Sequence, residues 1–296
     1  MNSVICFGEV LWDMLPTGAQ PGGAPLNVSV HLKKQGQNPV LISKVGNDEN
    51  GKRLLQFLKN SGINTKFIQT DDELPTSQVL VHLDENKNAR FEICEPVAWD
   101  AIKMNNQLKQ LVKSAGLIIF GSLASRNETT RETLFQLIEN TNAKLILDVN
   151  LRPPFHRRSI VEELLHKANM VKLNDDELVE ISAWNNISGN EKNLIKHISE
   201  YYNCSTVCVT RGENGAALFT ENSFYEHPGF KVDATDTVGA GDSFLASLVS
   251  NLLKNKSPEK SLEYACATGA LVASQKGAVP DYSIQQIEKI IKSVHL

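Results

Sequence analysis

A turn of small residues that ends in a carboxylate is the part of this sequence best suited to chemistry. Residues 236–242 read Asp-Thr-Val-Gly-Ala-Gly-Asp, and the apolar residues of 243–254 then recur as one helical stripe. The first turn of a helix presents unpaired N–H groups and a positive dipole end, and glycine lets an anion approach them. A carboxylate there, Asp242, suits a reaction in which a hydroxyl loses a proton while attacking a nearby phosphorus atom.

A second glycine-rich turn lies far upstream, where Gly22 and Gly23 precede Asn27. The glycine pair allows close approach to the backbone, and Asn27 would project from the first turns of a helix. Each turn alone is also explained as a loop that leads into a helix, with Asp242 as an acid favourable at a helix N-terminus. Two such turns in one chain favour a binding site.

The elements that must position these turns alternate between short apolar strands and amphipathic helices. Several predicted strands lack polar alternation, as expected for strands covered on both faces. The pattern predicts an α/β fold with a doubly wound, mostly parallel sheet flanked by helices. The predicted strands are residues 4–7, 40–45, 117–120, 144–148, 170–173 and 206–210, and the helices between them are 51–61, 129–140, 160–167 and 194–202.

One stretch departs from this alternation. Residues 77–83 and 89–94 alternate polar and apolar and are joined by the polar residues 84–88, which predicts a hairpin. With the segment after Glu9, this hairpin could form a small β-sheet that projects from the core. The chain has no G-x-G-x-x-G after its first strand and no G-x-x-x-x-G-K-[ST], so neither a Rossmann dehydrogenase nor a P-loop NTPase is supported.

Composition narrows the class of protein. The 296 residues carry a net charge of −4, which gives no basic surface for nucleic acid. No apolar run is long enough to span a bilayer, and the first residues are too polar for a signal peptide. The five cysteines are scattered, and Cys204 and Cys208 are better explained as buried thiols than as a metal pair. A reduced, cytoplasmic enzyme is predicted.

A polar turn, Asp148 to Arg152, follows the predicted strand 144–148. Ligands of open α/β sheets bind at the carboxyl ends of strands, so Asn150 and Arg152 are well placed to meet a substrate. Asn150 is equally explained by turn chemistry before Pro153. Arg152 is the stronger candidate, because a guanidinium stabilises charge on a phosphoryl group.

The two glycine turns resemble the signatures of the ribokinase-like (PfkB) carbohydrate kinases. Residues 236–242 match the family's Asp-Thr-x-Gly-Ala-Gly-Asp completely, and residues 22–27 match Gly-Gly-x-x-x-Asn. The resemblance covers nearly the whole chain. It implies a single ribokinase-like domain over 1–296, with a small β-sheet lid formed by inserted segments near 10–22 and 73–98. It also implies transfer of the γ-phosphoryl group of ATP to a primary hydroxyl of a sugar.

The resemblance assigns roles in the reaction. Asp242 is the expected base, the N–H groups of residues 239–241 stabilise developing charge, and Arg152 assists. The expected sugar site adds Asp13, whose carboxylate suits two vicinal hydroxyls. In full, the catalytic residues are Asp242, Gly239, Ala240, Gly241 and Arg152, and the substrate-binding residues are Asp13, Gly22, Gly23, Asn27, Asn150 and Asp242.

The resemblance also implies a nucleotide site with two cations. Asn174 and Glu177 match the family's Asn-x-x-Glu motif, which organises Mg²⁺ largely through water, and they equally fit a capped helix start. Residues 236–242, with their expected anion-binding N–H groups, are called the anion turn. Asp236 matches the carboxylate of a K⁺ site found behind this turn in many members. The expected nucleotide-binding residues are Asn174, Glu177, Thr210, Gly212, Gly239 and Gly241.

Within the family the chain is most like the fructokinases, on Gly-Gly-Ala-Pro-x-Asn together with Asp-Val-Asn-Leu-Arg. A 2-keto-3-deoxygluconate kinase and a nucleoside kinase are the alternatives of the same fold. Residues 90–95 contain two acids and one arginine, which favours a neutral sugar. A non-catalytic sugar-binding regulatory protein is the alternative of a different class, disfavoured because Asp242 and the glycines are present. The expected partners are sugar and ATP, without nucleic acid or membrane, and a homodimer is left open.

Overall fold

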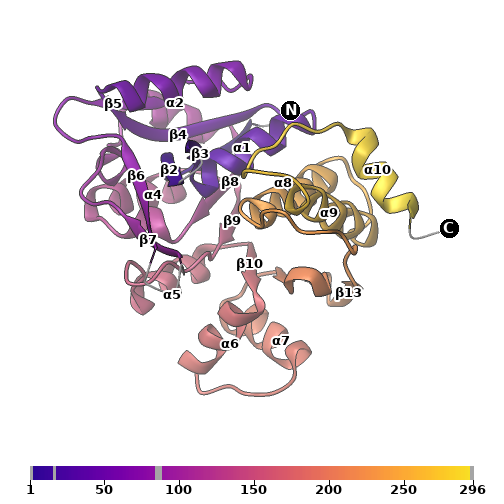
Figure 1. Ribbon diagram of the computed structural model, residues 1–296. Helices are drawn as coiled ribbons and strands as arrows, with labels where there is room; N and C mark the ends of the chain where they lie inside the picture. Colours follow the sequence, from indigo (N-terminus) through magenta and orange to yellow (C-terminus); the bar gives the residue numbers. More distant parts are fainter. Residues whose placement is uncertain (1–2, 16–17, 84–88, 294–296) are drawn as a thin grey trace.

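In the computed structural model, which describes residues 3–15, 18–83 and 89–293, a nine-stranded sheet forms the centre of the molecule (Figure 1). Its strand order is β13-β12-β11-β10-β9-β8-β1-β4-β5, and every neighbouring pair is parallel except those that involve β12. The strands are β1 (Ser3–Phe7), β4 (Pro39–Gly46), β5 (Ile68–Asp71), β8 (Ala115–Gly121), β9 (Lys144–Asp148), β10 (Met170–Asn174), β11 (Thr206–Thr210), β12 (Ala216–Thr220) and β13 (Ser223–His227).

Helices cover both faces of this sheet. On β1, Ile5 and Phe7 join one buried apolar cluster while Val4 and Cys6 join another, so successive residues face opposite layers. The first layer holds α3 (Asn106–Lys113), α4 (Glu128–Glu139), α5 (Arg158–Lys167), α6 (Asp175–Trp184) and α7 (Glu191–Tyr201). The second holds α1 (Ala24–Lys34), α2 (Glu49–Asn60), α8 (Ala240–Leu253), α9 (Pro258–Ala273) and α10 (Ile284–Ser293). The doubly wound α/β fold predicted from the sequence is confirmed.

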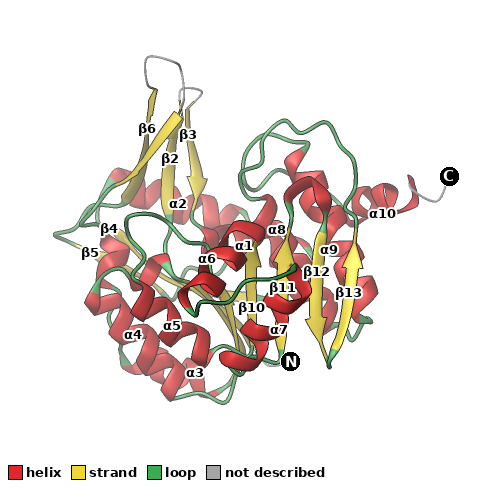
Figure 2. Cartoon of the chain, turned by 90° about the horizontal axis from the view of Figure 1, so that it is seen from below, coloured by secondary structure: helices red, strands yellow, loops and turns green. Residues whose placement is uncertain are grey.

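A smaller, separate sheet has the order β3-β2-β6-β7 and projects beyond the main body in Figure 2. Its strands are β2 (Leu11–Leu15), β3 (Gly18–Gly22), β6 (Ser77–Leu83) and β7 (Ala89–Ile93). They lie in the two segments predicted to form a small sheet, and β6 and β7 pair as the predicted hairpin. The loop 84–88 lies outside the described residues. That the sheet acts as a lid stays a prediction.

Some helices begin earlier than predicted. Helix α7 begins at Glu191, earlier than the predicted 194, because the side chain of Asn190 accepts a hydrogen bond from the Asn193 N–H. Helix α8 begins at Ala240 instead of 243, which places Asp242 inside its first turn.

The antiparallel strands β12 and β13 were not predicted. In the described part of the chain, no helix has both the length and the apolar character needed to cross a bilayer.

Candidate active site

Helix α8 begins at a glycine that no other residue could replace without strain. Gly239 is the N-cap, with a left-handed φ of 77°. A Cβ at this position would lie 2.4 Å from the carbonyl oxygen of Ala278. The turn is therefore packed directly against another backbone segment, and the start of α8 is held in one place.

The N–H groups of this turn are not equally free. The Ala240 N–H donates to the carbonyl of Thr237 at 3.2 Å and is already engaged in the turn. Among the described residues, the N–H groups of Gly239 and Gly241 have no acceptor. Of the three donors predicted for an anion, these two fit the role best.

The two glycine turns that the sequence singled out meet in space. Asn27 lies in the first turns of α1 and is 3% exposed, and its Nδ2 donates to Oδ2 of Asp242 at 2.8 Å. Gly23 is the N-cap of α1, with a φ of 102°. Asn27 and Asp242 come from helices far apart in the sequence. Their contact joins the predicted sugar loop, residues 22–27, to the predicted base.

The Asp242 carboxyl is tuned by its surroundings. Burial and then the negative charge of Asp148 raise its pKa to about 6, while the Asn27 hydrogen bond and the charges of Lys172 and Arg152 act in the opposite direction. A carboxyl with this pKa is ionised at neutral pH and is a stronger base than an ordinary aspartate. These properties suit a group that removes a proton from a hydroxyl.

Asp13 lies on β2 against the first glycine of the loop. A Cβ on Gly22 would lie 2.2 Å from Oδ2 of Asp13, so only glycine leaves room for this carboxylate. Burial raises the pKa of Asp13 to about 6; the charge of Arg152 lowers it, and that of Asp242 raises it. These mutual effects place Asp13 and Arg152 in the electrostatic surroundings of Asp242.

Arg152 and Asn150 follow β9, as predicted. Asn150 has a φ of 42°, so the turn explanation accounts for it: asparagine tolerates this left-handed conformation better than most residues. Arg152 is exposed, and its charge acts on the carboxyls of Glu9, Asp13 and Asp242. A substrate anion could therefore reach its guanidinium.

Sequence reasoning missed Glu9, the residue that follows Gly8 at the end of β1. Its side chain is 2% exposed, and Oε1 accepts a hydrogen bond from the Ala24 N–H at 3.3 Å, at the start of α1. Oε2 is buried without a hydrogen-bond partner among the described residues. Burial raises the pKa of Glu9 to about 7, and the charge of Asp242 adds to this. The signal available in the sequence was a charged residue close to the predicted strand 4–7, which is wholly apolar.

A buried ion pair beneath the anion turn was also missed. Lys172 on β10 and Asp148 on β9 are register partners, and Lys172 Nζ donates to Oδ1 of Asp148 at 2.8 Å. Burial opposes the ammonium charge, but the carboxylates of Asp148, Glu177 and Asp242 outweigh it and raise the pKa of Lys172. The Nζ would lie 3.4 Å from a Cβ on Gly241. A lysine inside the predicted apolar strand 170–173 was the available signal.

Asn174 and Glu177 form the helix cap that the sequence allowed. Asn174 Oδ1 accepts from the Glu177 N–H at 2.7 Å, and Oε2 of Glu177 accepts from the Asn174 N–H at 2.9 Å. Oε1 of Glu177 accepts from the Leu151 N–H at 2.8 Å. With each oxygen already bound to a backbone N–H, Glu177 fits contact with Mg²⁺ through water. The described residues contain no group of three or more His, Cys, Asp or Glu side chains able to hold a metal ion directly.

The turn after β11 is open at Gly212, which has a φ of 56° and nothing within 4 Å of its Cβ position. The hydroxyl of Thr210 donates to the carbonyl of Leu173 at 3.3 Å. Between them, Arg211 pairs with Glu191 of α7 and Glu226 of β13. Its charge is therefore used within the protein, while the backbone at Gly212 stays accessible.

Asp236 braces the anion turn. Its Oδ1 accepts from the Val238 N–H and its Oδ2 from the Gly277 N–H, both at 3.0 Å. The carboxylate thus joins the turn to the segment that packs on Gly239. Each oxygen keeps capacity for a further contact, which is compatible with a nearby cation.

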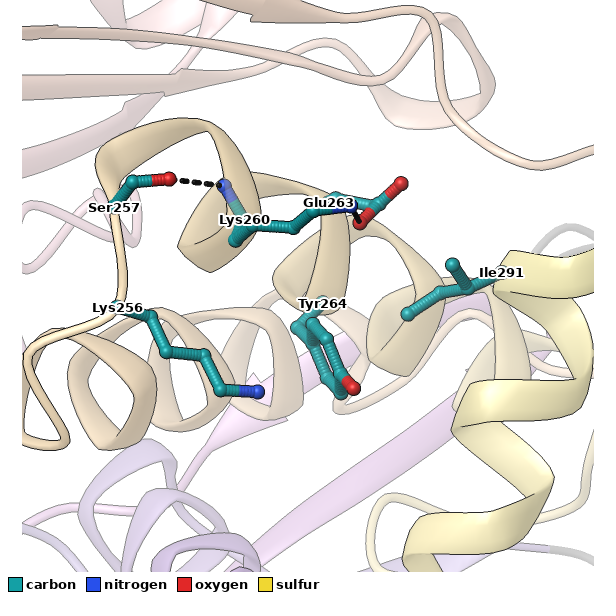
Figure 3. A pocket seen from close by; sticks show the side chains of 6 residues that line it. All are labelled: Lys256, Ser257, Lys260, Glu263, Tyr264 and Ile291. Carbon is teal, nitrogen blue, oxygen red and sulfur yellow. Dashed lines mark hydrogen bonds and ion pairs between the residues drawn. The ribbon is translucent and has the colours of Figure 1, made fainter.

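A surface cavity of about 320 Å³ lies at the other end of α8, between that end, α9 and α10 (Figure 3). None of the residues predicted for the active site lines it. Its lining residues are Lys256, Ser257, Lys260, Glu263, Tyr264 and Ile291.

Comparison with known proteins shows the family of the chain. The sequence profile of the pfkB family carbohydrate kinases matches residues 5–285. The chain belongs to this family. It is therefore a carbohydrate kinase, and the family and enzyme class inferred from its motifs are confirmed.

The relatives include named sugar kinases. The chain is 30% identical to a fructokinase of Salmonella typhimurium, over 94% of this chain and 96% of the relative. It is 29% identical to fructokinase-2 of Oryza sativa subsp. japonica, over 94% of this chain and 90% of the relative.

Solved structures share the fold. The fructokinase of Xylella fastidiosa with bound ATP superposes with a TM-score of 0.87 at 22% identity, covering 99% of both chains. A fructokinase double mutant of Vibrio cholerae O395, bound to fructose, ADP and potassium ion, gives a TM-score of 0.85 at 24% identity, covering 98% of both. These likenesses show the ribokinase-like fold of this pfkB carbohydrate kinase.

Proposed function

We propose that the protein is a fructokinase, which transfers the γ-phosphoryl group of ATP to the terminal primary hydroxyl of fructose and forms fructose 6-phosphate. The observation that carries the proposal is the 2.8 Å contact between Asn27 and Asp242, which brings the sugar loop to the base at the start of α8. The fructokinases among its relatives support the choice of sugar.

In the proposed reaction, Asp242 accepts the proton of the sugar hydroxyl as its oxygen bonds to the γ-phosphorus. The bond between that phosphorus and the β–γ bridging oxygen breaks, and ADP leaves. The N–H groups of Gly239 and Gly241 stabilise the negative charge that develops on the transferring group. Arg152, which is exposed and whose charge acts on Asp242, would add positive charge. Asp13, Gly22, Gly23 and Asn27 hold the sugar.

The cation roles are also proposed. Mg²⁺, held through water by Glu177 beside Asn174, would neutralise phosphate charge when bound. The turn at Thr210 and Gly212 would lie beside the nucleotide phosphates. K⁺ near Asp236 would fix the anion turn, and the potassium ion bound in the Vibrio cholerae fructokinase supports this choice. The five free cysteines support a reducing compartment, so we place the enzyme in the cytoplasm.

The charges around the site favour a neutral acceptor over 2-keto-3-deoxygluconate. Glu9, Asp13 and Asp242 are acidic. In the described part of the chain, the cations whose charge acts on Asp242 are Lys172 and Arg152, and Lys172 is already paired with Asp148, which leaves Arg152. An acidic sugar would meet net repulsion unless it bound Arg152 directly.

An ADP-release assay with fructose, ribose, 2-keto-3-deoxygluconate and adenosine tests the proposal. We expect the highest kcat/KM for fructose, and a much larger loss of sugar use than of ATP affinity in Asp13→Ala. A preference for the keto-deoxy acid would overturn the substrate but not the kinase. Nucleotide binding without phosphorylation of any sugar would favour the non-catalytic alternative.

Salt exchange tests the monovalent cation. At equal ionic strength, we expect K⁺ to give a higher rate than Na⁺ or a bulky organic cation, and Asp236→Ala to remove the difference. Equal rates in all three salts would contradict a cation site at Asp236.

A further inference from the structure

The segment 277–282, part of the connection between α9 and α10, packs directly on the anion turn. The Gly277 N–H donates to Oδ2 of Asp236 at 3.0 Å. A Cβ on Gly239 would lie within 2.8 Å of three atoms of Ala278. The two nearest of these atoms belong to the Ala278 backbone, so a displacement of Ala278 would move Gly239 as well.

A histidine of α1 holds the same segment from its other side. Nε2 of His31 lies 2.9 Å from the carbonyl oxygen of Ala278, and Nδ1 lies 2.9 Å from the hydroxyl of Tyr282. A carbonyl oxygen can only accept, so Nε2 carries the proton and Nδ1 accepts from Tyr282. The ring is completely buried and stacks on Tyr282 with centroids 5.6 Å apart. Burial lowers the pKa of His31 to about 4, so this single tautomer persists at neutral pH.

Helix α1 thus contacts the start of α8 in two ways. Asn27 donates directly to Asp242, and four residues later His31 reaches Gly239 through Ala278. Lys34 adds a third contact to the segment, by donating to the carbonyl of Pro280. The base and the N–H groups of the anion turn are therefore held by one rigid helix.

We propose that His31 is a positioning residue for phosphoryl transfer. By donating from Nε2 to the Ala278 carbonyl, it fixes segment 277–282 against Gly239 and so sets the anion-binding N–H groups relative to Asp242. This inference rests on the proposed kinase reaction. A displacement of about 1 Å at a reacting geometry can cost on the order of 10²-fold in rate, so a contact outside the site can matter for turnover.

A set of near-isosteric variants separates the two hydrogen bonds of His31. In His31→Gln the amide nitrogen can take the place of Nε2 and keep the bond to Ala278. In His31→Asn the amide oxygen can take the place of Nδ1 and keep the bond to Tyr282, and Tyr282→Phe removes only the latter bond. His31→Leu removes both. Ser29→Ala is the matched control, because it deletes a buried hydrogen bond of the same helix, to the Pro25 carbonyl, without touching segment 277–282.

Steady-state kinetics with fructose and ATP give the first readout. We expect His31→Leu and His31→Asn to lower kcat about tenfold or more, with KM for the sugar little changed. His31→Gln, Tyr282→Phe and Ser29→Ala should stay within about threefold of the parent protein. Wild-type kcat in His31→Leu, or equal losses in His31→Leu and Ser29→Ala, would overturn the proposal.

Amide hydrogen exchange gives a readout that does not depend on the substrate. Peptides covering 236–242 should lose protection in His31→Leu but keep it in Ser29→Ala, at a temperature where both variants are folded. Unchanged protection in His31→Leu would contradict the coupling even if kcat fell. If the unmodified protein phosphorylates no sugar, the proposed function fails, while the exchange result still decides whether His31 fixes the turn.

Discussion

The amide of Asn27 donates to the carboxylate of Asp242 at 2.8 Å, and this contact connects α1 directly to the first turn of α8. It also acts on the chemistry of the carboxyl that we propose as the base. A hydrogen bond to the ionised carboxylate favours that form, so Asn27 restrains the pKa of Asp242, which burial and Asp148 have raised to about 6.

The first prediction concerns the base. Asp242→Asn keeps the shape of the side chain but cannot accept the proton, so kcat should fall by about 10²-fold or more. Nucleotide affinity, measured by titration calorimetry, should change little. Turnover close to that of the parent protein would show that another group removes the proton.

The second prediction concerns pH. The base must be ionised, so kcat should decline as pH falls through about 6, the raised pKa of Asp242. Asn27→Ala removes a hydrogen bond that lowers this pKa, so the acidic limb of the profile should move to higher pH. Profiles of kcat against pH at saturating sugar measure the shift. An acidic limb at the same pH in Asn27→Ala and in the parent protein would contradict the role of Asn27.

The third prediction concerns the buried pair. Lys172→Met leaves the carboxylate of Asp148 buried and unpaired, which should reduce the free energy of unfolding by about 3–5 kcal/mol. Asp148→Leu combined with Lys172→Met removes both charges and should recover much of that loss. Urea unfolding of the single and double variants makes the comparison. A double variant no more stable than Lys172→Met would argue that Lys172 acts through other contacts.

The fourth prediction concerns Glu9, whose pKa burial raises from 4.5 to about 7. Between these values the folded state binds more protons than the unfolded state, so the Glu9 contribution to stability falls as pH rises toward 7. Above pH 7 the ionised carboxyl costs on the order of 3 kcal/mol. Glu9→Gln, which keeps an acceptor for Ala24, should gain stability relative to the parent at pH 8, and the gain should shrink toward pH 5. A difference independent of pH would contradict this assignment.

Six strands of the central sheet could be predicted because their apolar runs are short and bounded by turn residues, whereas β5, β12 and β13 were not predicted. The buried β12 was missed although Ala216, Ala217, Leu218 and Phe219 are apolar, because its antiparallel pairing departs from the alternation of strand and helix. The meeting of Asn27 and Asp242 was expected only from the family resemblance, because no local pattern predicts a contact across 215 residues.

Polar residues in apolar surroundings were the hardest to interpret. Lys172 lies within a predicted buried strand, yet only the register of β9 and β10 shows that Asp148 lies opposite it. Glu9 required the position of α1, since its hydrogen-bond partner Ala24 follows two intervening strands. Such pairings depend on tertiary structure and have no spacing that a sequence could reveal.

The four-residue spacing along helix α1 limits the insertions and deletions that the helix can accept. Three positions with proposed roles, Gly23, Asn27 and His31, are spaced by four residues and so lie along one side of the helix. Adding or removing one residue between Asn27 and His31 would rotate the later position by about 100° and turn the imidazole away from Ala278. Residues 25–32 of the helix are all buried, so both the length and the composition of this helical segment are constrained.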